Sequence, residues 1–257
     1  MLTSLSNPKI KLVRALARRK ERYAEKKFIV EGVRLIEEAA HTSILPAFVL
    51  HVASADDDSR AHALLDRLRA TTQVLAVSDA VMKEISNTET PQGVLAVVPF
   101  IELPLPASPQ FVLILDAVRD PGNVGAIMRS ARAAGVDEII FASSSADPYN
   151  DKVVRSAMGA HFSLPVRMMG WKEIKELMET IPRVYLADAS GEVDYMRADW
   201  SRPIALIVGG EAAGASDEAK QIATTRVSIP MRGGAESLNA AMAATVLLFE
   251  VARHSVV

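Results

Sequence analysis

Apolar residues in the first hundred positions fall into short runs separated by segments with apolar spacing of three to four residues. The runs predict strands and the spaced segments predict amphipathic helices. The pattern gives a basic helix over 5–23, capped by Ser6 or Asn7 with Pro8 at its first position, and a strand that turns into a helix over 28–40. Further strands are predicted at 47–53, 73–78 and 93–100, and further helices at 59–71 and 79–86. Alternating elements with short connections predict a small α/β layer domain.

A proline-rich stretch separates this region from a second series of elements. Residues 99–110 contain four prolines in twelve positions, which disfavours a sheet interior, so two domains are expected, 1–104 and 105–257. The run 111–118 is apolar throughout, as in strands buried on both faces of a parallel sheet. Strands are also predicted at 138–143, 183–189, 203–210 and 226–231, with helices at 124–134, 151–160, 171–180, 216–223 and 238–252. The second domain is therefore expected to be a five-stranded α/β layer structure.

Composition narrows the class of protein. The chain has 257 residues, 49% of them apolar, and no cysteine, which excludes disulfides and thiol chemistry and agrees with a cytoplasmic protein. No apolar run approaches the roughly eighteen residues that span a bilayer, and the first thirty residues lack the apolar core of a signal peptide. The five histidines are scattered without ligand spacing, so no metal site is expected.

Charge is distributed unevenly along the chain. Residues 1–30 hold nine Lys or Arg against two Glu, a balance of +7, within a chain whose net charge is −2. Such a segment suits contact with the phosphates of a nucleic acid, through residues such as Arg14, Arg18 and Arg19. A solvated face of an amphipathic helix explains the same pattern, and charge alone leaves both interpretations open.

Three loops in the second half contain most of the candidate chemistry. The first, in LDAVRDPGNVGAIMRSARAAG (115–135), places Asn123 as the expected N-cap of a helix and Gly122 at an expected special backbone angle. Arg129 and Arg132 share one accessible face of that helix. The alternative is that Asn123 only caps and the arginines are only solvated. The loop lacks the GxGxxG dinucleotide fingerprint, and no acidic residue ends the next strand to hold a ribose.

The second and third loops also follow apolar strands. LIVGGEAAGAS (206–216) allows close backbone approach of a ligand at Gly209 and places Glu211 beyond the carboxyl end of a strand. SIPMRGGAESLNAAMAATVLLFE (228–250) places Ser237 as an expected helix cap and Asn239 in the first turn. Two polar residues at the mouth of an apolar helix suggest a lined pocket, and the alternative is a capped core helix.

These loops, together with DPYNDKVVRSAMGA (147–160), resemble the motifs of the SpoU (TrmH-like) RNA ribose 2′-O-methyltransferases of the SPOUT superfamily. The resemblance implies transfer of a methyl group from S-adenosylmethionine to a ribose 2′-hydroxyl. It implies a catalytic role for Asn123, Arg129, Ser237 and Asn239, with Arg129 orienting the hydroxyl and stabilising developing negative charge. Cofactor contacts are implied at Gly209, Ile229, Met231 and Leu238, and RNA contacts at Lys152, Arg155 and Glu211.

The same resemblance implies an architecture and partners. The second domain would be an α/β trefoil knot that forms a homodimer, and the first would be an L30e-like RNA-binding domain. The basic N-terminal helix and this domain favour rRNA over tRNA as substrate. Two alternatives stay open from the residues: a non-catalytic RNA-binding or ribosome-assembly protein on the same fold, and a nucleotide-dependent oxidoreductase.

Overall fold

The chain packs as two units, and the first of them includes a short segment from the second half of the chain. The computed structural model describes residues 1–42, 44–211 and 214–254. Unit 1 consists of Met1–Ile101 and Tyr149–Phe162, and unit 2 consists of Glu102–Pro148 and Ser163–Val257. The first unit thus ends beside the proline-rich stretch that suggested a boundary at 104/105. That residues 149–162 pack with unit 1, although they lie in the second half of the chain, was not predicted from periodicity.

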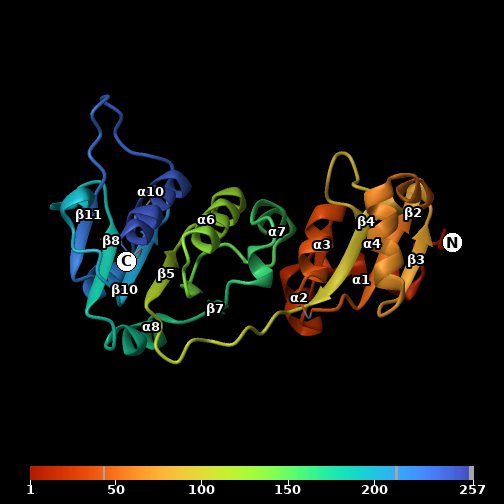
Figure 1. Cartoon of the computed structure of the whole chain (residues 1–257), viewed down its shortest axis with the longest axis horizontal. Helices are drawn as coiled ribbons and strands as arrows, with labels where there is room; N and C mark the ends of the chain where they lie inside the picture. Colours follow the sequence, from red (N-terminus) through yellow and green to blue (C-terminus); the bar gives the residue numbers. More distant parts are fainter. Residues whose placement is uncertain (43, 212–213, 255–257) are drawn as a thin grey trace. The chain divides into compact units, whose positions relative to one another are not determined.

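Unit 1 is built on a four-stranded mixed sheet in the order β1-β4-β2-β3 (Figure 1). Strands β2 and β3 pair in parallel, whereas β4 runs antiparallel to both β1 and β2. The strands are β1 (Lys27–Glu31), β2 (Phe48–Val52), β3 (Val74–Val77) and β4 (Val94–Pro99), and the helices are α1 (Pro8–Leu16), α2 (Arg19–Glu25), α3 (Val33–Ala40), α4 (Ser59–Arg69) and α5 (Asp79–Ile85), with a 3-10 turn η1 (Ala53–Asp57). The α/β layer domain expected from periodicity is therefore present.

The basic N-terminal segment is two helices, so the prediction of one helix over 5–23 was wrong. Asn7 caps α1 by accepting a hydrogen bond from the Lys9 backbone N–H, and Pro8 occupies the first turn, as expected. The break follows from Arg22, whose buried guanidinium donates to the carbonyl oxygens of Leu16 and Ala17, both at 2.8 Å. Because these carbonyls are satisfied by a side chain, α1 can end there without a buried unpaired acceptor.

The segment 149–162 completes the core of unit 1. The Tyr149 ring stacks on Phe100 at 3.9 Å between centroids and lies 5.1 Å from the ring of Phe28. Val154 and Phe162 belong to the same buried cluster. Only α7 (Asp151–Ser156) is α-helical here, followed by the 3-10 turn η2 (Ala160–Phe162), so the predicted helix over 151–160 is shorter than expected.

Unit 2 contains a seven-stranded parallel sheet in the order β7-β6-β5-β10-β8-β11-β9. Its strands are β5 (Phe111–Asp116), β6 (Glu138–Phe141), β7 (Val166–Met168), β8 (Arg183–Ala187), β9 (Val193–Asp194), β10 (Ile204–Gly209) and β11 (Thr225–Ser228). The five predicted strands form its centre. The two strands missed, β7 and β9, are edge strands of three and two residues, too short to show a periodic signal.

Helices cover both faces of this sheet. They are α6 (Pro121–Ala133), α8 (Trp171–Met178), α9 (Asp217–Ile222) and α10 (Ala240–Arg253), and a 3-10 turn η3 (Tyr195–Arg197) follows β9. Alternate residues of the central strands, such as Val112 and Ile114, share a buried cluster with α8 and α9. On the other face α6 packs against α10, and the Ser130 and Thr245 hydroxyls are hydrogen-bonded at 2.8 Å (Figure 1).

Among the described residues no helix has the length and apolar character that crossing a membrane requires.

Candidate active site

The carboxyl end of β10 is packed so closely that only glycine fits. A Cβ added to Gly209 would lie 2.7 Å from the backbone nitrogen of Ala215, and one added to Gly210 would lie 2.2 Å from the carbonyl oxygen of Ala117. Such contacts are far inside van der Waals distance. The two glycines therefore let the loop after β10 fold back against the strand end, at the edge where parallel sheets bind ligands. Residues 212–213 of this second loop lie outside the described residues.

Helix α6 begins earlier than the sequence suggested, which changes the role of Asn123. Asp120 is the N-cap, and its carboxylate accepts the backbone N–H of Asn123 at 2.9 Å. Pro121 occupies the first turn, and Gly122 is an ordinary helical residue rather than one with a positive φ. The expected cap at Asn123 was wrong, because Asp120 satisfies the free N–H group and leaves the Asn123 amide available for other contacts.

Helix α10 shows the opposite shift. It starts at Ala240, and its cap is Asn239, whose Oδ1 accepts the backbone N–H groups of Ala241 at 2.9 Å and Met242 at 3.3 Å. Ser237, the expected cap, instead stands two residues ahead in an exposed loop. This loop between β11 and α10 projects from the sheet in Figure 1.

The first, second and third loops are joined by a chain of two side-chain hydrogen bonds. The Asn239 Nδ2 donates to Asn123 Oδ1 at 3.0 Å, and the Asn123 Nδ2 donates to Glu211 Oε1 at 2.5 Å. Because the Asn239 oxygen is already committed to capping α10, its NH₂ group must point towards Asn123. The direction of both amides is thus fixed from the helix end outwards.

The second and third loops border a cavity of about 660 Å³ at the carboxyl ends of β8, β10 and β11. One part of its wall is apolar and includes Val208, Ile229, Met231, Leu238 and Leu247. The polar part consists of Asp188, Gly209, Gly210, Glu211, Lys220, Ser237 and Asn239. The volume and the mixture of apolar walls with a few polar groups are those of a site for a molecule of cofactor size.

Arg129 is placed differently from the other predicted catalytic residues. It is exposed on α6 and does not line the cavity of its own chain. Its guanidinium has no hydrogen-bond or ion-pair partner within the described part of the chain. Asn123 also stays outside the cavity lining and reaches it through Glu211 and Asn239.

The predicted RNA-contacting residues other than Glu211 all belong to unit 1. Arg14, Arg18 and Arg19 are exposed on α1, at the break and on α2. Arg18 lies 3.6 Å from Glu21, and the Arg19 guanidinium lies 5.4 Å from the centre of the Tyr23 ring. The break in the helix thus presents three arginines over two short helices rather than along one.

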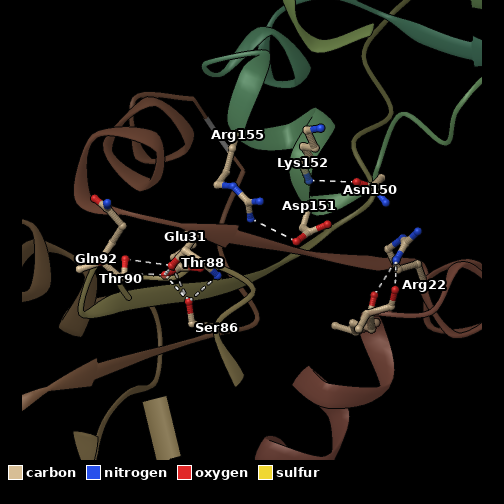
Figure 2. Close-up of polar contacts among 12 residues, drawn as sticks. Arg22, Glu31, Ser86, Thr88, Thr90, Gln92, Asn150, Asp151, Lys152 and Arg155 are labelled. Carbon is tan, nitrogen blue, oxygen red and sulfur yellow. Dashed lines mark hydrogen bonds and ion pairs between the residues drawn. The ribbon is translucent and has the colours of Figure 1, made fainter. Parts of the chain in front are cut away.

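Lys152 and Arg155 lie on α7 (Figure 2). Asn150 caps this helix by accepting the Lys152 backbone N–H, and Arg155 forms an ion pair with Asp151 at 3.1 Å. Arg155 is therefore already engaged by a carboxylate of its own helix, which makes it a weaker candidate for phosphate contact than the arginines of α1 and α2.

Two acidic residues that sequence reasoning missed stand at the ends of apolar strands. Asp116 ends β5, is 1% exposed, and accepts the backbone N–H of Ser216 at 2.6 Å, which fixes the start of α9. Asp188 follows β8 and lines the cavity. The signal was available in LILD and YLAD, where an acidic residue closes an apolar strand.

Comparison with known proteins agrees with this fold and identifies the family of the chain. Residues 110–249 match the model of the SpoU rRNA methylase family, and residues 7–96 match the MRM3-like substrate binding domain. The chain belongs to the SpoU rRNA methylase family. It is 34% identical to the Bacillus subtilis 23S rRNA (guanosine(2553)-2′-O)-methyltransferase RlmP over 97% of this chain and 98% of that relative.

Three further matches, one to a protein sequence and two to crystal structures, support the assignment. The chain is 34% identical to a Streptomyces viridochromogenes 23S rRNA (uridine(2479)-2′-O)-methyltransferase, over 94% of this chain and 88% of that protein. Its fold matches the crystal structure of the SpoU methyltransferase AviRb from the same organism in complex with AdoMet, with a TM-score of 0.88, 32% identity and coverage of 97% and 98%. An AdoMet-bound rRNA methyltransferase from Sinorhizobium meliloti matches with a TM-score of 0.86, 31% identity and coverage of 100% and 98%.

Proposed function

We propose that this protein transfers the methyl group of S-adenosylmethionine to a ribose 2′-hydroxyl of rRNA, and that it acts as a homodimer in the cytoplasm. The observation that carries the proposal is the Asn239–Asn123–Glu211 hydrogen-bond chain at the rim of the cavity. Relatives that span nearly the whole chain are named as 23S rRNA 2′-O-methyltransferases, which favours rRNA over tRNA.

The cavity suits S-adenosylmethionine. Its apolar wall at Ile229, Met231 and Leu238 fits the adenine, and Gly209 lines the same cavity, where it offers backbone groups to a ligand. When bound, S-adenosylmethionine supplies an electrophilic methyl group on a sulfonium, which is a good leaving group. The protein therefore has to align the acceptor hydroxyl and exclude water rather than activate a poor electrophile.

The polar rim performs this alignment. Ser237 and Asn239 present a hydroxyl and an oriented amide at the cavity edge, and Asn123 holds Asn239 in place. Glu211 fixes the far side of the Asn123 amide. No described group of His, Asp or Glu side chains is arranged to hold a metal ion. Ser237, Asn239, Asn123 and Glu211 act by hydrogen bonding and by position.

Arg129 supplies the remaining positive charge, and we place it in the active site of the partner subunit. Its guanidinium is exposed and unpaired within the described residues, yet it is absent from the cavity of its own chain. The helix that packs against α6, α10, exposes Met242, Val246 and Phe249, with Met242 63% and Phe249 47% exposed, and Leu238 is exposed in the loop just before it. An apolar stripe of this kind on a soluble helix is best covered by another copy of the same surface.

Across such an interface the guanidinium would orient the ribose hydroxyl and a neighbouring phosphate by its fixed fork of donors. The proton of the hydroxyl leaves to a phosphate oxygen or to water, because an arginine stays protonated at neutral pH. Unit 1 selects the RNA through the exposed arginines of α1 and α2. Its match to a substrate-binding domain supports this division of labour.

The test is methyl transfer from radiolabelled S-adenosylmethionine to rRNA from a strain that lacks this protein, followed by mapping of the 2′-O-methyl mark. Arg129→Ala and Asn239→Ala should each lower transfer by about a hundredfold or more. Lys172→Ala, which removes an exposed cation of α8 outside the cavity lining, is the matched control and should leave transfer unchanged.

Mixing the two inactive variants tests the shared site. In a mixed dimer one cavity keeps Asn239 and receives Arg129 from its partner, so that one complete site forms. Random mixing should restore roughly a quarter of wild-type turnover, since about half of the dimers are mixed and each has one of two sites. No recovery, with dimers confirmed by sedimentation, would place Arg129 in its own subunit's site.

A further inference from the structure

Asp188 is a charged side chain of the cavity to which the proposed function has so far given no role. It follows β8 directly and is half-buried. Its Oδ1 accepts two hydrogen bonds from Ser190, from the backbone N–H at 2.9 Å and from the hydroxyl at 2.7 Å. Its Oδ2 has no hydrogen-bond partner among the described residues, although the side chain lines the cavity.

Ser190 thus holds the carboxylate in one orientation. With both of its bonds on Oδ1, rotation of the carboxylate is restricted and Oδ2 remains the acceptor that is not used within the chain. Burial would raise the pKa of Asp188, but the hydrogen bonds from Ser190 and the charges of Arg226 and Lys220 outweigh it and lower the pKa. The group is therefore a carboxylate at neutral pH, with acceptor capacity and no proton to donate.

The register of the sheet places Asp188 between the two ends of the cavity. Ala187 stands opposite Val208 of β10 and opposite Val227 of β11, and the backbone N–H of Asp188 donates to the Val227 carbonyl at 3.0 Å. Asp188 therefore adjoins Gly209 on one side and the strand that leads to Ile229 on the other. Gly209 precedes the polar rim, and Ile229 begins the apolar wall.

We infer that Asp188 binds the ribose hydroxyls of S-adenosylmethionine. This inference rests on the proposed function, because it takes the cofactor to lie in this cavity. In that molecule the ribose joins the adenine to the sulfonium. A group between the apolar wall and the reactive rim is thus next to the sugar. A fixed carboxylate accepting hydrogen bonds from a vicinal diol is a common solution at the end of a parallel strand.

The neighbouring cation agrees with this assignment. Lys220 lines the same cavity from α9 and lies 3.6 Å from Asp217 rather than bonded to Asp188. Asp188 is thus not consumed by an ion pair with Lys220. Its free oxygen is available to neutral hydroxyl donors, for which a charged acceptor gives stronger hydrogen bonds than a neutral one.

The experiment is calorimetric binding of S-adenosylhomocysteine and of 5′-methylthioadenosine to the full chain without RNA. The first ligand has the adenine, the ribose and the amino-acid part, and the second lacks the amino-acid part. Asp188→Asn should weaken both by the same factor, of about tenfold or more, as expected for loss of a hydrogen bond to a charged group. Glu218→Gln, an exposed carboxylate of α9 outside the cavity, is the matched control and should bind both ligands as the wild type does.

A second variant guards against a folding defect. Ser190→Ala keeps the carboxylate but removes a hydrogen bond that orients it, so it should weaken both ligands by a smaller factor than Asp188→Asn. Thermal unfolding of each variant shows whether the fold is retained. If Asp188→Asn weakens S-adenosylhomocysteine alone, the carboxylate faces the amino group of the ligand and the ribose assignment is wrong. Unchanged binding of both ligands, with the wild type binding normally, overturns any cofactor contact. Failure of the wild type to bind either ligand would instead overturn the proposed function.

Discussion

Asn239 has two roles, as the cap of α10 and as a hydrogen-bond donor to Asn123, and one pair of substitutions should separate their effects. Its Oδ1 caps α10 by accepting two backbone N–H groups, and its Nδ2 donates to Asn123 at 3.0 Å. Asn239→Ala removes both roles. Asn239→Asp keeps the capping oxygen, since Asp and Asn cap helices about equally well, but it removes the NH₂ donor.

The expected effects on stability differ between the two variants. Loss of the cap in Asn239→Ala should cost about 1 kcal/mol. For a unit of this size that lowers the melting temperature by about 2–4 °C. In Asn239→Asp the cap is kept, and the added negative charge at the start of α10 is favourable by about 0.3–1 kcal/mol, so the melting temperature should stay near that of the wild type.

The expected effects on catalysis are the same. Either variant loses the donor that orients Asn123, and removal of one positioned donor from a polar site costs about a hundredfold in turnover. The assay is single-turnover methyl transfer beside a thermal melt on the same preparations. Ser78→Ala, which removes the cap of α5 in unit 1, is the control that should lose stability and keep transfer. Wild-type turnover in Asn239→Asp, or equal melting of the Ala and Asp variants, would refute this division.

Three further predictions concern other parts of the chain. Gly210→Ala places a Cβ within 2.2 Å of the carbonyl oxygen of Ala117. The variant should destabilise unit 2 by about 1–3 kcal/mol and bind S-adenosylhomocysteine more weakly in calorimetry. Near-normal melting and binding would contradict the close packing described. Glu31→Ala removes a buried carboxylate whose Oε1 accepts three hydrogen bonds from residues 86–92 (Figure 2). Limited proteolysis should therefore cut that loop sooner in the variant than in the wild type. Glu31→Gln should have a smaller effect. Hydrogen bonds from Ser201 lower the pKa of Asp199 from 3.8 to about 2. The contribution of Asp199 to stability is therefore complete above pH 3.8 and lost as the pH falls through 2. In acid unfolding, Asp199→Asn should lose less stability than the wild type across that window.

Sequence patterns were sufficient for the elements with a strong period. The apolar runs of β5 and β10 are buried along their length, and both were placed within two residues by their apolar character alone. The break between α1 and α2 could not be found this way, because the amphipathic spacing continues across Ala17. It depends on where a single buried guanidinium, that of Arg22, finds its acceptors.

The site shows the same limit at finer scale. The motifs identified Asn123 and Asn239, but the predicted caps were wrong. Asn123 and Ser237 were expected to cap the two helices, whereas Asp120 caps α6 and Asn239 caps α10. Which polar residue caps a helix depends on a shift of one to three positions, and element ends are the least reliable part of a periodicity argument. The trefoil knot likewise stays a prediction, since threading leaves no trace in local spacing.

The caps that the structure shows, Asp120 on α6 and Asn239 on α10, explain why the site uses two amides rather than one. A single asparagine at the start of α10 has its oxygen bound to the helix, so its NH₂ group needs an acceptor in the one direction in which it points. Asn123 offers one fixed acceptor, because its own amide is held by Glu211. Asp120 makes this possible by capping α6 in place of Asn123. In the first loop an acidic cap, Asp120, is followed three residues later by the amide of Asn123. This order allows the starts of α6 and α10 to share one hydrogen-bonded polar rim.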